Sequence, residues 1–373
     1  AADAVARCQT AGVRVVMITG DHPATAAAVA RELGILRQGR LVTGAELQEL
    51  SDSELAGQID KIEVFARVAP AVKLRIVHAL QALGEVVDMT GDGINDAPAL
   101  KRADIGVAMG RGGTDVAKDA AAMTLTDDNF ATVVAAVDEG RAIYDNIKKY
   151  LMYLLSSNTG ELGLMVGATL LGWPLPLTAI QLLYVNLATD GLPALALALD
   201  PPAADLMQRR PRPAGQGIFT PPVVKLMLLG GLWSAIVNLA LYHVVLSRSG
   251  DHVLAATVTF LSLVCIQFIK AYAFRSLDRP TLRKPFGNRW LNWAVAGEVV
   301  VLAALYAVPA LRGVLDMVAV PGADLALALG VAITVIPVLD AAKWWLSRPG
   351  AAPDQPLPVK ANLGTTPGPA HPT

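Results

Sequence analysis

The sequence predicts a doubly wound α/β domain with a parallel sheet, followed by an all-α bundle of six membrane-spanning helices. Three observations support this fold class. Short β-rich apolar runs alternate with helical patterns in the first part of the chain. Long apolar segments take over after Tyr150. Hydrophobic residues make up 53% of the chain and charged residues 17%, which is too apolar for an ordinary soluble protein.

We expect three regions along the 373 residues. Residues 1–140 are expected to form a partial cytoplasmic α/β domain, residues 141–346 a stalk with six spans, and residues 347–373 a disordered tail rich in Pro, Gly and Ala. The chain begins with Ala1 and opens inside a helix-like run. We therefore expect it to be the C-terminal part of a longer protein.

Composition narrows the class of protein further. A net charge of −1 gives no reason to expect a nucleic-acid partner. The two cysteines, Cys8 and Cys265, fall in a soluble stretch and in an apolar segment, so a structural disulfide between them is not expected. Neither has neighbours that suit a metal site.

The α/β part contains five segments that are typical of buried strands. They are residues 13–18, 64–68, 85–89, 105–109 and 122–125. Helical patterns follow the first two, over residues 24–33 and 71–83. This alternation predicts a Rossmann-like parallel sheet, in which ligands bind at the carboxyl ends of the strands.

Polar residues gather just past these strand ends or on the helices that follow. They are Thr19, Gly20, Asp21, Lys73, Asp92, Asn95 and Asp96. Carboxylates and an amide around a glycine-rich turn suit Mg²⁺ beside a phosphoryl group, and N–H groups at a strand-to-helix turn favour an anion. Each residue also has a simpler interpretation. Asp21 could cap the following helix, Lys73 could be a surface lysine, and the other carboxylates could belong to ordinary turns.

Six apolar segments follow, each about the ~20 residues that cross a bilayer core. They are residues 150–172, 175–199, 222–246, 253–274, 290–311 and 322–346. Lysine and arginine concentrate in alternate loops. By the positive-inside rule, the soluble part, the long basic loops and the C-terminus are expected in the cytoplasm.

A proline-free helical pattern runs from Arg141 to Leu171. At ~1.5 Å per residue it would reach about 46 Å, longer than the ~30 Å hydrocarbon core. The excess predicts a cytoplasmic stalk that ties the α/β domain to the first span.

The first two apolar segments carry polar residues that suit a hard-cation site. They are Asn158, Glu161, Asn186, Thr189 and Asp190. An acidic side chain at mid-bilayer costs roughly 2.5–3.5 kcal/mol on insertion scales, so packing is a poor explanation for two of them. Pro193 has no N–H for the Thr189 carbonyl, and Gly191 loosens the same turn. A freed carbonyl there would add another oxygen ligand.

Other polar residues of the apolar segments have weaker assignments. Glu298 has no evident partner and is expected to be structural or protonated. Asn238, His243 and Lys270 are expected to form interhelical hydrogen bonds or to extend toward the membrane edge. Gln267 is left open between the cation site and simple packing.

The motifs together resemble those of the P-type ATPases, and within them the calcium-pump branch. They are Met-Ile-Thr-Gly-Asp at 17–21, Arg-Val-Ala-Pro at 67–70 with Lys73, Met-Thr-Gly-Asp-Gly-Ile-Asn-Asp-Ala-Pro at 89–98, Ser-Ser-Asn-Thr-Gly-Glu at 156–161 and Val-Asn-Leu-Ala-Thr-Asp-Gly-Leu-Pro-Ala at 185–194. The resemblance is close over residues 1–275 and loose over the last two spans. It implies a haloacid-dehalogenase-like fold in the soluble part.

The resemblance also implies residue roles. In that family the aspartate of an Asp-Lys-Thr-Gly-Thr motif takes the γ-phosphoryl group of ATP. The residues implied in phosphoryl transfer are Thr19, Gly20, Asp21, Lys73, Asn95 and Asp96, of which Lys73 and Asn95 are also implied in binding ATP; Asp92 is implied as the Mg²⁺ ligand. The implied ligands of the transported cation are Asn158, Glu161, Asn186, Thr189 and Asp190.

The function implied is ATP-driven export of Ca²⁺ from the cytoplasm, in a multi-pass protein of the plasma membrane. This sequence does not contain the phospho-accepting Asp motif, the nucleotide domain or the first four spans of that family. The family's separate Thr-Gly-Glu loop, which serves dephosphorylation, is also absent from it. The missing N-terminal part is therefore an expected partner, and the chain alone is expected to be inactive. Gln267 aligns with a glutamate of two-site calcium pumps, which favours one ion per cycle. Alternatives are a Mn²⁺ or alkali-cation pump, a membrane-anchored phosphohydrolase, and a non-catalytic fragment acting as a partner or passive ion path.

Overall fold

The computed structural model describes residues 1–213 and 215–347. These residues divide into two units, each described by itself below. The first comprises residues 1–136 and 204–213, and the second comprises residues 137–203 and 215–347. The expected disordered tail lies almost entirely outside the described residues.

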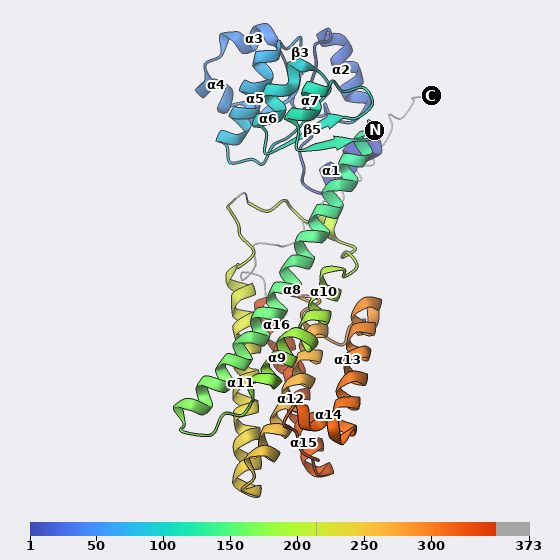
Figure 1. Ribbon diagram of the computed structural model, residues 1–373. Coiled ribbons are helices and arrows are strands. Elements are labelled where there is room, and N and C mark those ends of the chain that lie inside the picture. The colour runs from blue at the N-terminus through green and yellow to red at the C-terminus, as the bar shows by residue number, and fades with distance from the viewer. Residues whose placement is uncertain (214, 348–373) are drawn as a thin grey trace, which may run out of the picture. The chain divides into compact units, whose positions relative to one another are not determined.

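The first unit is built on two three-stranded parallel sheets, ordered β1-β3-β2 and β4-β5-β6 (Figure 1). The strands are β1 (Met17–Ile18), β2 (Arg40–Thr43), β3 (Ile62–Ala66), β4 (Asp88–Gly91), β5 (Ile105–Met109) and β6 (Met123–Leu125). The predicted parallel α/β architecture is confirmed. The sequence did not indicate β2, because only Val42 of this edge strand is buried and the segment has no apolar run.

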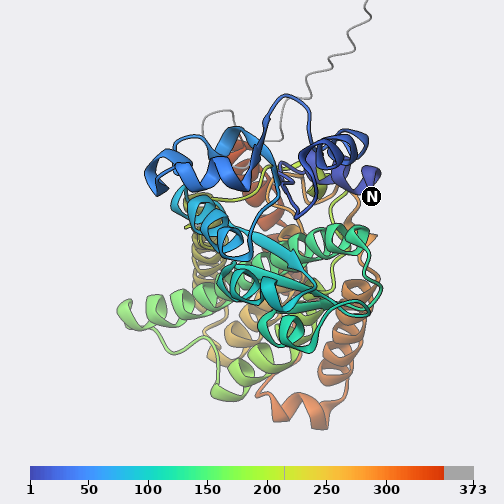
Figure 2. The ribbon, with the colours of Figure 1, turned by 90° about the horizontal axis from the view of Figure 1, so that it is seen from above.

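Helices lie around these strands (Figure 2). They are α1 (Ala2–Thr10), α2 (Pro23–Glu32), α3 (Gly44–Glu49), α4 (Asp52–Ala56), α5 (Pro70–Ala82), α6 (Ala97–Arg102) and α7 (Asp115–Ala120), with the short turns η1 (Ile59–Lys61), η2 (Ile94–Asp96) and η4 (Leu206–Gln208). The cap of α2 differs from the expected one. His22 is the N-cap, and its Nδ1 accepts the Ala24 N–H at 3.3 Å, so Asp21 is left free of that role.

The second unit is helical. Its elements are α8 (Phe130–Leu170, which begins in the first unit), α9 (Ala179–Tyr184), η3 (Val185–Thr189), α10 (Gly191–Ala198), α11 (Pro221–Ser249), α12 (His252–Ala273), η5 (Pro285–Gly287), α13 (Arg289–Ala307), α14 (Pro309–Val314), α15 (Gly322–Ile333) and α16 (Val335–Leu346). Proline begins α11 and α14, where its missing N–H costs no helical hydrogen bond.

Five helical segments in the described part of the chain are long and apolar enough to cross a membrane. They are Ala179–Ala198, Pro221–Ser249, His252–Ala273, Arg289–Ala307 and Gly322–Leu346. The predicted span at 150–172 lies in α8 and is not among the five. The reason is the polar run Ser156–Glu161 within it, which lowers its mean hydropathy. The sixth span therefore stays a prediction.

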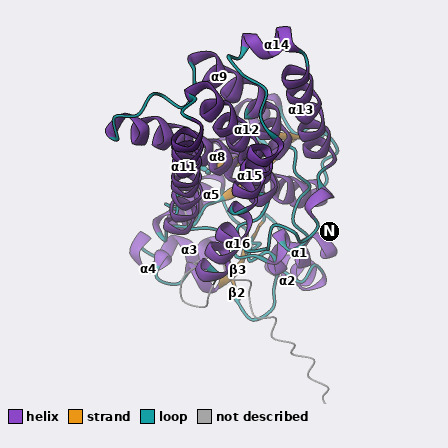
Figure 3. Cartoon of the chain, turned by 90° about the horizontal axis from the view of Figure 1, so that it is seen from below, coloured by secondary structure: helices purple, strands orange, loops and turns teal. Residues whose placement is uncertain are grey.

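Helix α12 is the centre of this bundle. It packs against α11, α15, α16, α10 and α13, and Figure 3 shows it surrounded by its neighbours. In its apolar window 72% of the residues are buried, against 17% for α13. Most polar side chains of α12 are therefore enclosed by protein and need a partner there.

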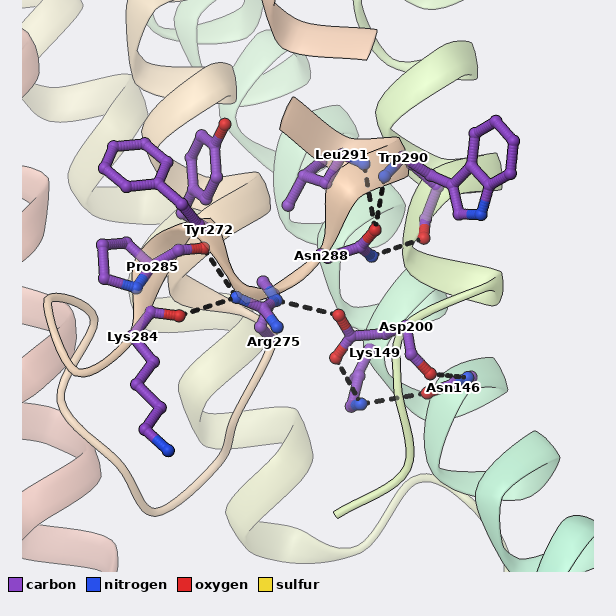
Figure 4. Close-up of polar contacts among 12 residues, drawn as sticks. Asn146, Lys149, Asp200, Tyr272, Arg275, Lys284, Pro285, Asn288, Trp290 and Leu291 are labelled. Carbon is purple, nitrogen blue, oxygen red and sulfur yellow. Dashed lines mark hydrogen bonds and ion pairs between the residues drawn. The ribbon is translucent and has the colours of Figure 1, made fainter. Parts of the chain in front are cut away.

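An ionic network joins the middle of α8 to the ends of α10 and α12 (Figure 4). Asp200, just after α10, accepts hydrogen bonds from Lys149 of α8 at 2.7 Å and from Arg275, just after α12, at 2.8 Å. Asn146 of α8 donates to the Asp200 carbonyl at 2.7 Å. The Asp200 carboxylate thus fastens α8 and α12 at one point.

Candidate functional site

The segment after β1 is held against the end of β3. The Thr19 N–H donates to the Phe65 carbonyl at 2.9 Å, and the Val68 N–H donates back to the Thr19 carbonyl at 3.2 Å. The Arg67 N–H donates to the Asp21 carbonyl at 3.2 Å. The Thr19 Oγ1 accepts the Asp21 N–H at 3.1 Å. The turn is therefore fixed beside the segment that leads into α5.

Helix α5 brings Lys73 to the loop after β4. Its Nζ lies 2.5 Å from Asp96 Oδ1, and Asp96 Oδ2 accepts the N–H groups of Asp92 and Gly93 at 3.3 and 3.2 Å. Burial by itself raises the pKa of Asp96, but the hydrogen bonds from Lys73 and the two N–H groups hold the pKa of this carboxyl below its usual range. A side chain at Gly91 would come within 2.5 Å of the Asp96 Cβ, so the loop needs glycine there.

The other expected phosphate-site residues face outward. Gly20, Asp21, Asp92 and Asn95 are exposed, while Thr19 is half-buried. Asp96 has both oxygens engaged, whereas the Asp92 and Asn95 side chains accept no hydrogen bond within the described part of the chain. The donor set accordingly fits Mg²⁺ at Asp92 and a supporting role for Asp96.

Neither unit, within the described residues, contains a group of three or more His, Cys, Asp or Glu side chains placed to hold a metal ion. Asp92 can thus supply only part of a Mg²⁺ coordination shell.

The second unit contains a polar cluster formed by three separate elements, and all of its members are buried except Asn186, which is exposed. Glu161 of α8 accepts a hydrogen bond from the Asn186 amide of η3 at 2.7 Å and another from the Gln267 amide of α12 at 2.8 Å. Thr189 of η3 donates to the Gln267 oxygen at 3.0 Å. Gln267, left open by the sequence, thus links Glu161 to Thr189.

Asp190 completes this group, which we call the cation cluster: Glu161, Asn186, Thr189, Asp190 and Gln267. Tyr153 of α8 donates to Asp190 Oδ1 at 3.0 Å and lies 3.1 Å from the Thr189 carbonyl. The second oxygen of Asp190, Oδ2, is buried and has no hydrogen-bond partner in the described chain. Leaving such an atom unsatisfied costs about 1–3 kcal/mol, more when it is charged. A hard cation would satisfy it.

The backbone of η3 departs from the α-helix at this cluster. The Asp190 N–H donates to the Val185 carbonyl at 2.9 Å, which makes residues 185–189 a π-helical turn. Such turns are frequent at functional sites. The distortion lies one turn before the one expected at Gly191 and Pro193, where α10 is a regular helix. The Thr189 carbonyl, expected to be free for a cation, instead receives the Tyr153 hydroxyl.

The structure does not join every expected ligand to the cluster. Asn158 is exposed, and no hydrogen bond among the described residues connects it to Glu161, so its role stays a prediction. Sequence reasoning missed Tyr153, although it lies on the same α8 face two turns before Glu161. Glu298 of α13 is buried with Oε2 unpartnered in the described chain, and its role stays open.

Family models of known proteins match both parts of the chain. The family model "Cation transporting ATPase, C-terminus" matches residues 174–345, and two "haloacid dehalogenase-like hydrolase" models match residues 1–104 and 73–137. The chain belongs to the P-type cation-transporting ATPase family. As a member of that family it is a multi-pass membrane protein, and its soluble part has the haloacid-dehalogenase-like fold.

Its relatives include calcium pumps from distant organisms. It is 44% identical to a calcium-transporting ATPase of Bacillus subtilis over 329 residues, which covers 88% of this chain. It is 43% identical to a probable cation-transporting ATPase F of Mycobacterium tuberculosis, over 85% of the chain. It is 38% identical to calcium-transporting ATPase 1 of Schizosaccharomyces pombe, over 93% of the chain. The chain spans 37%, 36% and 40% of the length of these relatives.

Proposed function

We propose that the full-length protein is an ATP-driven pump that exports Ca²⁺ from the cytoplasm through an aspartyl-phosphate intermediate. The observation that carries the proposal is the cation cluster. It buries two carboxylates, the Gln267 amide and a hydroxyl together among apolar helices, with the exposed Asn186 amide bonded to Glu161, and it leaves Asp190 Oδ2 without a partner in the described chain. Burying these groups in a membrane is costly unless a cation compensates them.

Ca²⁺ is the cation that this donor set suits best. Ca²⁺ takes six to eight oxygen ligands with flexible geometry, and every residue of the cluster carries at least one side-chain oxygen. Relatives that carry the name calcium-transporting ATPase support the same choice. Asn186 and Glu161 are engaged with one another in this structure, so cation binding would require their hydrogen bond to rearrange. Mn²⁺ and alkali cations are the outcomes that a cation screen must separate from Ca²⁺.

The first unit is proposed to carry out phosphoryl transfer with ATP as the substrate. Thr19 and the Gly20 N–H would bind the phosphoryl oxygens, and Lys73 would neutralise charge on the group that is transferred. Asp96 holds the Lys73 ammonium and the N–H groups of the next loop in place. Asp21 and Asn95 flank the same edge. Positioning and charge neutralisation supply most of the catalysis in this type of reaction.

Asp92 would hold Mg²⁺, with Asn95 beside it. When bound, Mg²⁺ would neutralise charge on the phosphate oxygens. The chain's own contribution is the fixed loop: the Asp92 carbonyl accepts the Thr114 N–H at 2.8 Å, which anchors the backbone that presents the Asp92 side chain.

The nucleophilic aspartate is proposed to come from a segment of the full-length protein upstream of Ala1. Strands β1 and β4 are edges of their sheets within the described residues. Ile18 of β1 packs against the cluster that contains Met89 of β4. A parallel strand that pairs with both edges would place a residue at its carboxyl end between Thr19 and Asp92.

The protein is proposed to lie in the plasma membrane with the first unit and the C-terminus in the cytoplasm. The basic residues of the loops after α10 and α12 support this orientation, because such loops stay on the cytoplasmic side.

The test is ATP hydrolysis by the complete protein reconstituted in lipid, in a screen of Ca²⁺, Mn²⁺, Na⁺ and K⁺. Activation by micromolar Ca²⁺, with an acid-stable phosphoenzyme that forms only when Ca²⁺ is present, is the expected result. Activation by another cation alone would replace Ca²⁺ in the proposal. A complete protein that hydrolyses no ATP with any cation would support the non-catalytic alternative.

A further inference from the structure

The loop that joins α12 to α13 carries positive charge that none of the roles above uses. Between residues 274 and 289 the chain has five basic residues but only one acidic residue, Asp278. Three of the basic side chains are exposed and form no ion pair with a carboxylate in the described part of the chain. They are Arg283, Lys284 and Arg289. Their charges are therefore available to a ligand.

Exposed aromatic side chains lie beside these charges. Phe286, Trp290 and Trp293 are 73%, 50% and 75% exposed. The Arg289 guanidinium lies over the Trp290 ring, 5.0 Å from its centroid. Because α13 begins at Arg289 and is long and apolar enough to cross a membrane, these rings lie at the level of the lipid head groups. We call the set the interfacial patch: Arg283, Lys284, Phe286, Arg289, Trp290 and Trp293.

The loop that presents the interfacial patch is fixed to the helical bundle. Arg275 donates to the Lys284 and Pro285 carbonyls at 3.0 and 2.6 Å (Figure 4). The Asn288 amide donates to the Ala196 carbonyl of α10 at 2.8 Å. Lys284 has a left-handed backbone, with φ 58°, which is uncommon for a residue other than glycine. Its side chain extends away from Arg275 in Figure 4. The charges are thus held in place before a ligand binds.

We propose that the interfacial patch binds the head group of an anionic phospholipid. The phosphodiester would accept hydrogen bonds from Lys284 and from the two guanidinium groups. The exposed aromatic rings would pack against the glycerol backbone and the upper part of the acyl chains. A zwitterionic head group carries its own cation, which three unpaired basic side chains would repel. The inference requires that α13 spans the membrane and does not depend on which cation is transported.

Competition between two lipids tests the site. The purified full-length protein would be titrated with phosphatidylglycerol or phosphatidylcholine, and bound lipid would be counted by native mass spectrometry. Each basic residue next to a span strengthens binding of anionic lipid by about fivefold. We therefore expect a wild-type preference for phosphatidylglycerol, a loss of about fivefold in Lys284→Gln, and a larger loss in the triple variant Arg283→Gln/Lys284→Gln/Arg289→Gln. Binding of phosphatidylcholine should not change.

A second triple variant is the matched control. Arg31→Gln/Lys61→Gln/Lys101→Gln removes the same charge from exposed residues of the first unit. It is expected to keep the wild-type preference. Glycerol 3-phosphate, added in excess, supplies the phosphate without acyl chains. It is expected to leave bound phosphatidylglycerol in place, because the aromatic rings have nothing to pack against.

Several outcomes would overturn the inference. Equal wild-type affinity for the two lipids is one, and a preference that survives in the triple variant of the patch is another. A preference lost equally in the control would mean that net charge decides. Displacement by glycerol 3-phosphate would identify a site for soluble phosphate. If the triple variant does not fold, Lys284→Gln still decides. None of these measurements uses ATP or Ca²⁺, so failure here is distinct from failure of the proposed function.

Discussion

Two regions satisfy their polar groups in opposite ways: the cation cluster of the second unit and a set in the first unit that we call the phosphate edge. The phosphate edge comprises Thr19, Gly20, Asp21, Lys73, Asp92, Asn95 and Asp96. At the phosphate edge, Lys73 and Asp96 form a close ion pair, while Asp21, Asp92 and Asn95 are exposed. In the cation cluster, Glu161 and Gln267 bind one another although 106 residues separate them in sequence.

This difference reflects the surroundings of each site. Exposed groups can bond to water, so a turn can present them individually without cost. Groups buried between apolar helices have no access to water and must form hydrogen bonds with one another or bind a ligand. The phosphate edge is consequently a set of local motifs, whereas the cation cluster exists only when α8, η3 and α12 are packed together.

The largest effect is expected from Asp190→Asn. Loss of a partner that merely orients a metal ligand already costs ~10–100-fold in affinity, so loss of a proposed ligand should cost more. Ca²⁺-activated phosphorylation of the full-length protein by ATP measures it, and nucleotide binding should be unchanged. Normal activation by Ca²⁺ in this variant would remove Asp190 from the site.

Lys73→Met tests the phosphate edge. Removing one stabilising group from a developing charge typically lowers the rate by ~10²–10³-fold. Rapid-quench measurement of phosphoenzyme formation should show this loss while Ca²⁺ binding stays at its wild-type level. If the rate were unchanged, Lys73 would be only the structural partner of Asp96.

Tyr153→Phe tests whether the cation cluster depends on a single hydroxyl group. It removes the hydroxyl that contacts Asp190 and the Thr189 carbonyl, so a loss of about 10-fold in apparent Ca²⁺ affinity is expected. Tyr150→Phe, one turn earlier on α8, is the matched control and should have wild-type affinity. Equal effects of the two substitutions would mean that general packing of α8, rather than the hydroxyl, sets the affinity.

Gly91→Ala tests how tightly the phosphate loop is built. The added Cβ would overlap Asp96, and overpacking of this kind costs about 1–3 kcal/mol. Gly20→Ala is a suitable control, because a Cβ at Gly20 meets no atom within 4 Å. Thermal unfolding of the two variants should differ, with Gly91→Ala the less stable. A wild-type transition for Gly91→Ala would show that the loop can relax.

The smallest effect is a dependence of stability on acid. The pKa of Asp96 is lower in the folded protein than its unfolded value of ~3.9, so its stabilising contribution is complete above that value and is lost as pH falls through the folded pKa. Unfolding measured from neutral pH into this acidic range should show less loss of stability in Asp96→Asn than in the wild type. Equal acid sensitivity would indicate that Asp96 contributes nothing measurable.

Much of this architecture could be predicted from local pattern. The parallel α/β arrangement and the ends of α2 and α5 follow from strand and helix patterns with proline at helix starts. The outward turns of the phosphate edge were also predictable, because they depend on neighbouring residues. The role of Gly91 was not, since it is visible only when Asp96 is placed against it.

The cation cluster could be predicted from the sequence only in part. Its acidic members stand out in an apolar sequence, but the links through Gln267 and Tyr153 depend on which helices pack together. The burial of Lys270, which forms the expected interhelical hydrogen bond by donating to the Ser156 carbonyl of α8 at 3.0 Å, depends on the central position of α12 in the bundle. Edge strand β2 was missed for a related reason, because its exposure removes the apolar run that marks a strand.

The Asp200 network has a mechanical consequence. The Asp200 carboxylate forms ion pairs with Lys149 of α8 and with Arg275 at the end of α12. The same two helices carry Glu161 and Gln267. Sliding α8 lengthwise past α12 would move Lys149 and Arg275 in opposite directions relative to each other. Such a movement requires one of the two ion pairs at Asp200 to break, whereas a tilt of α8 about Asp200 keeps both.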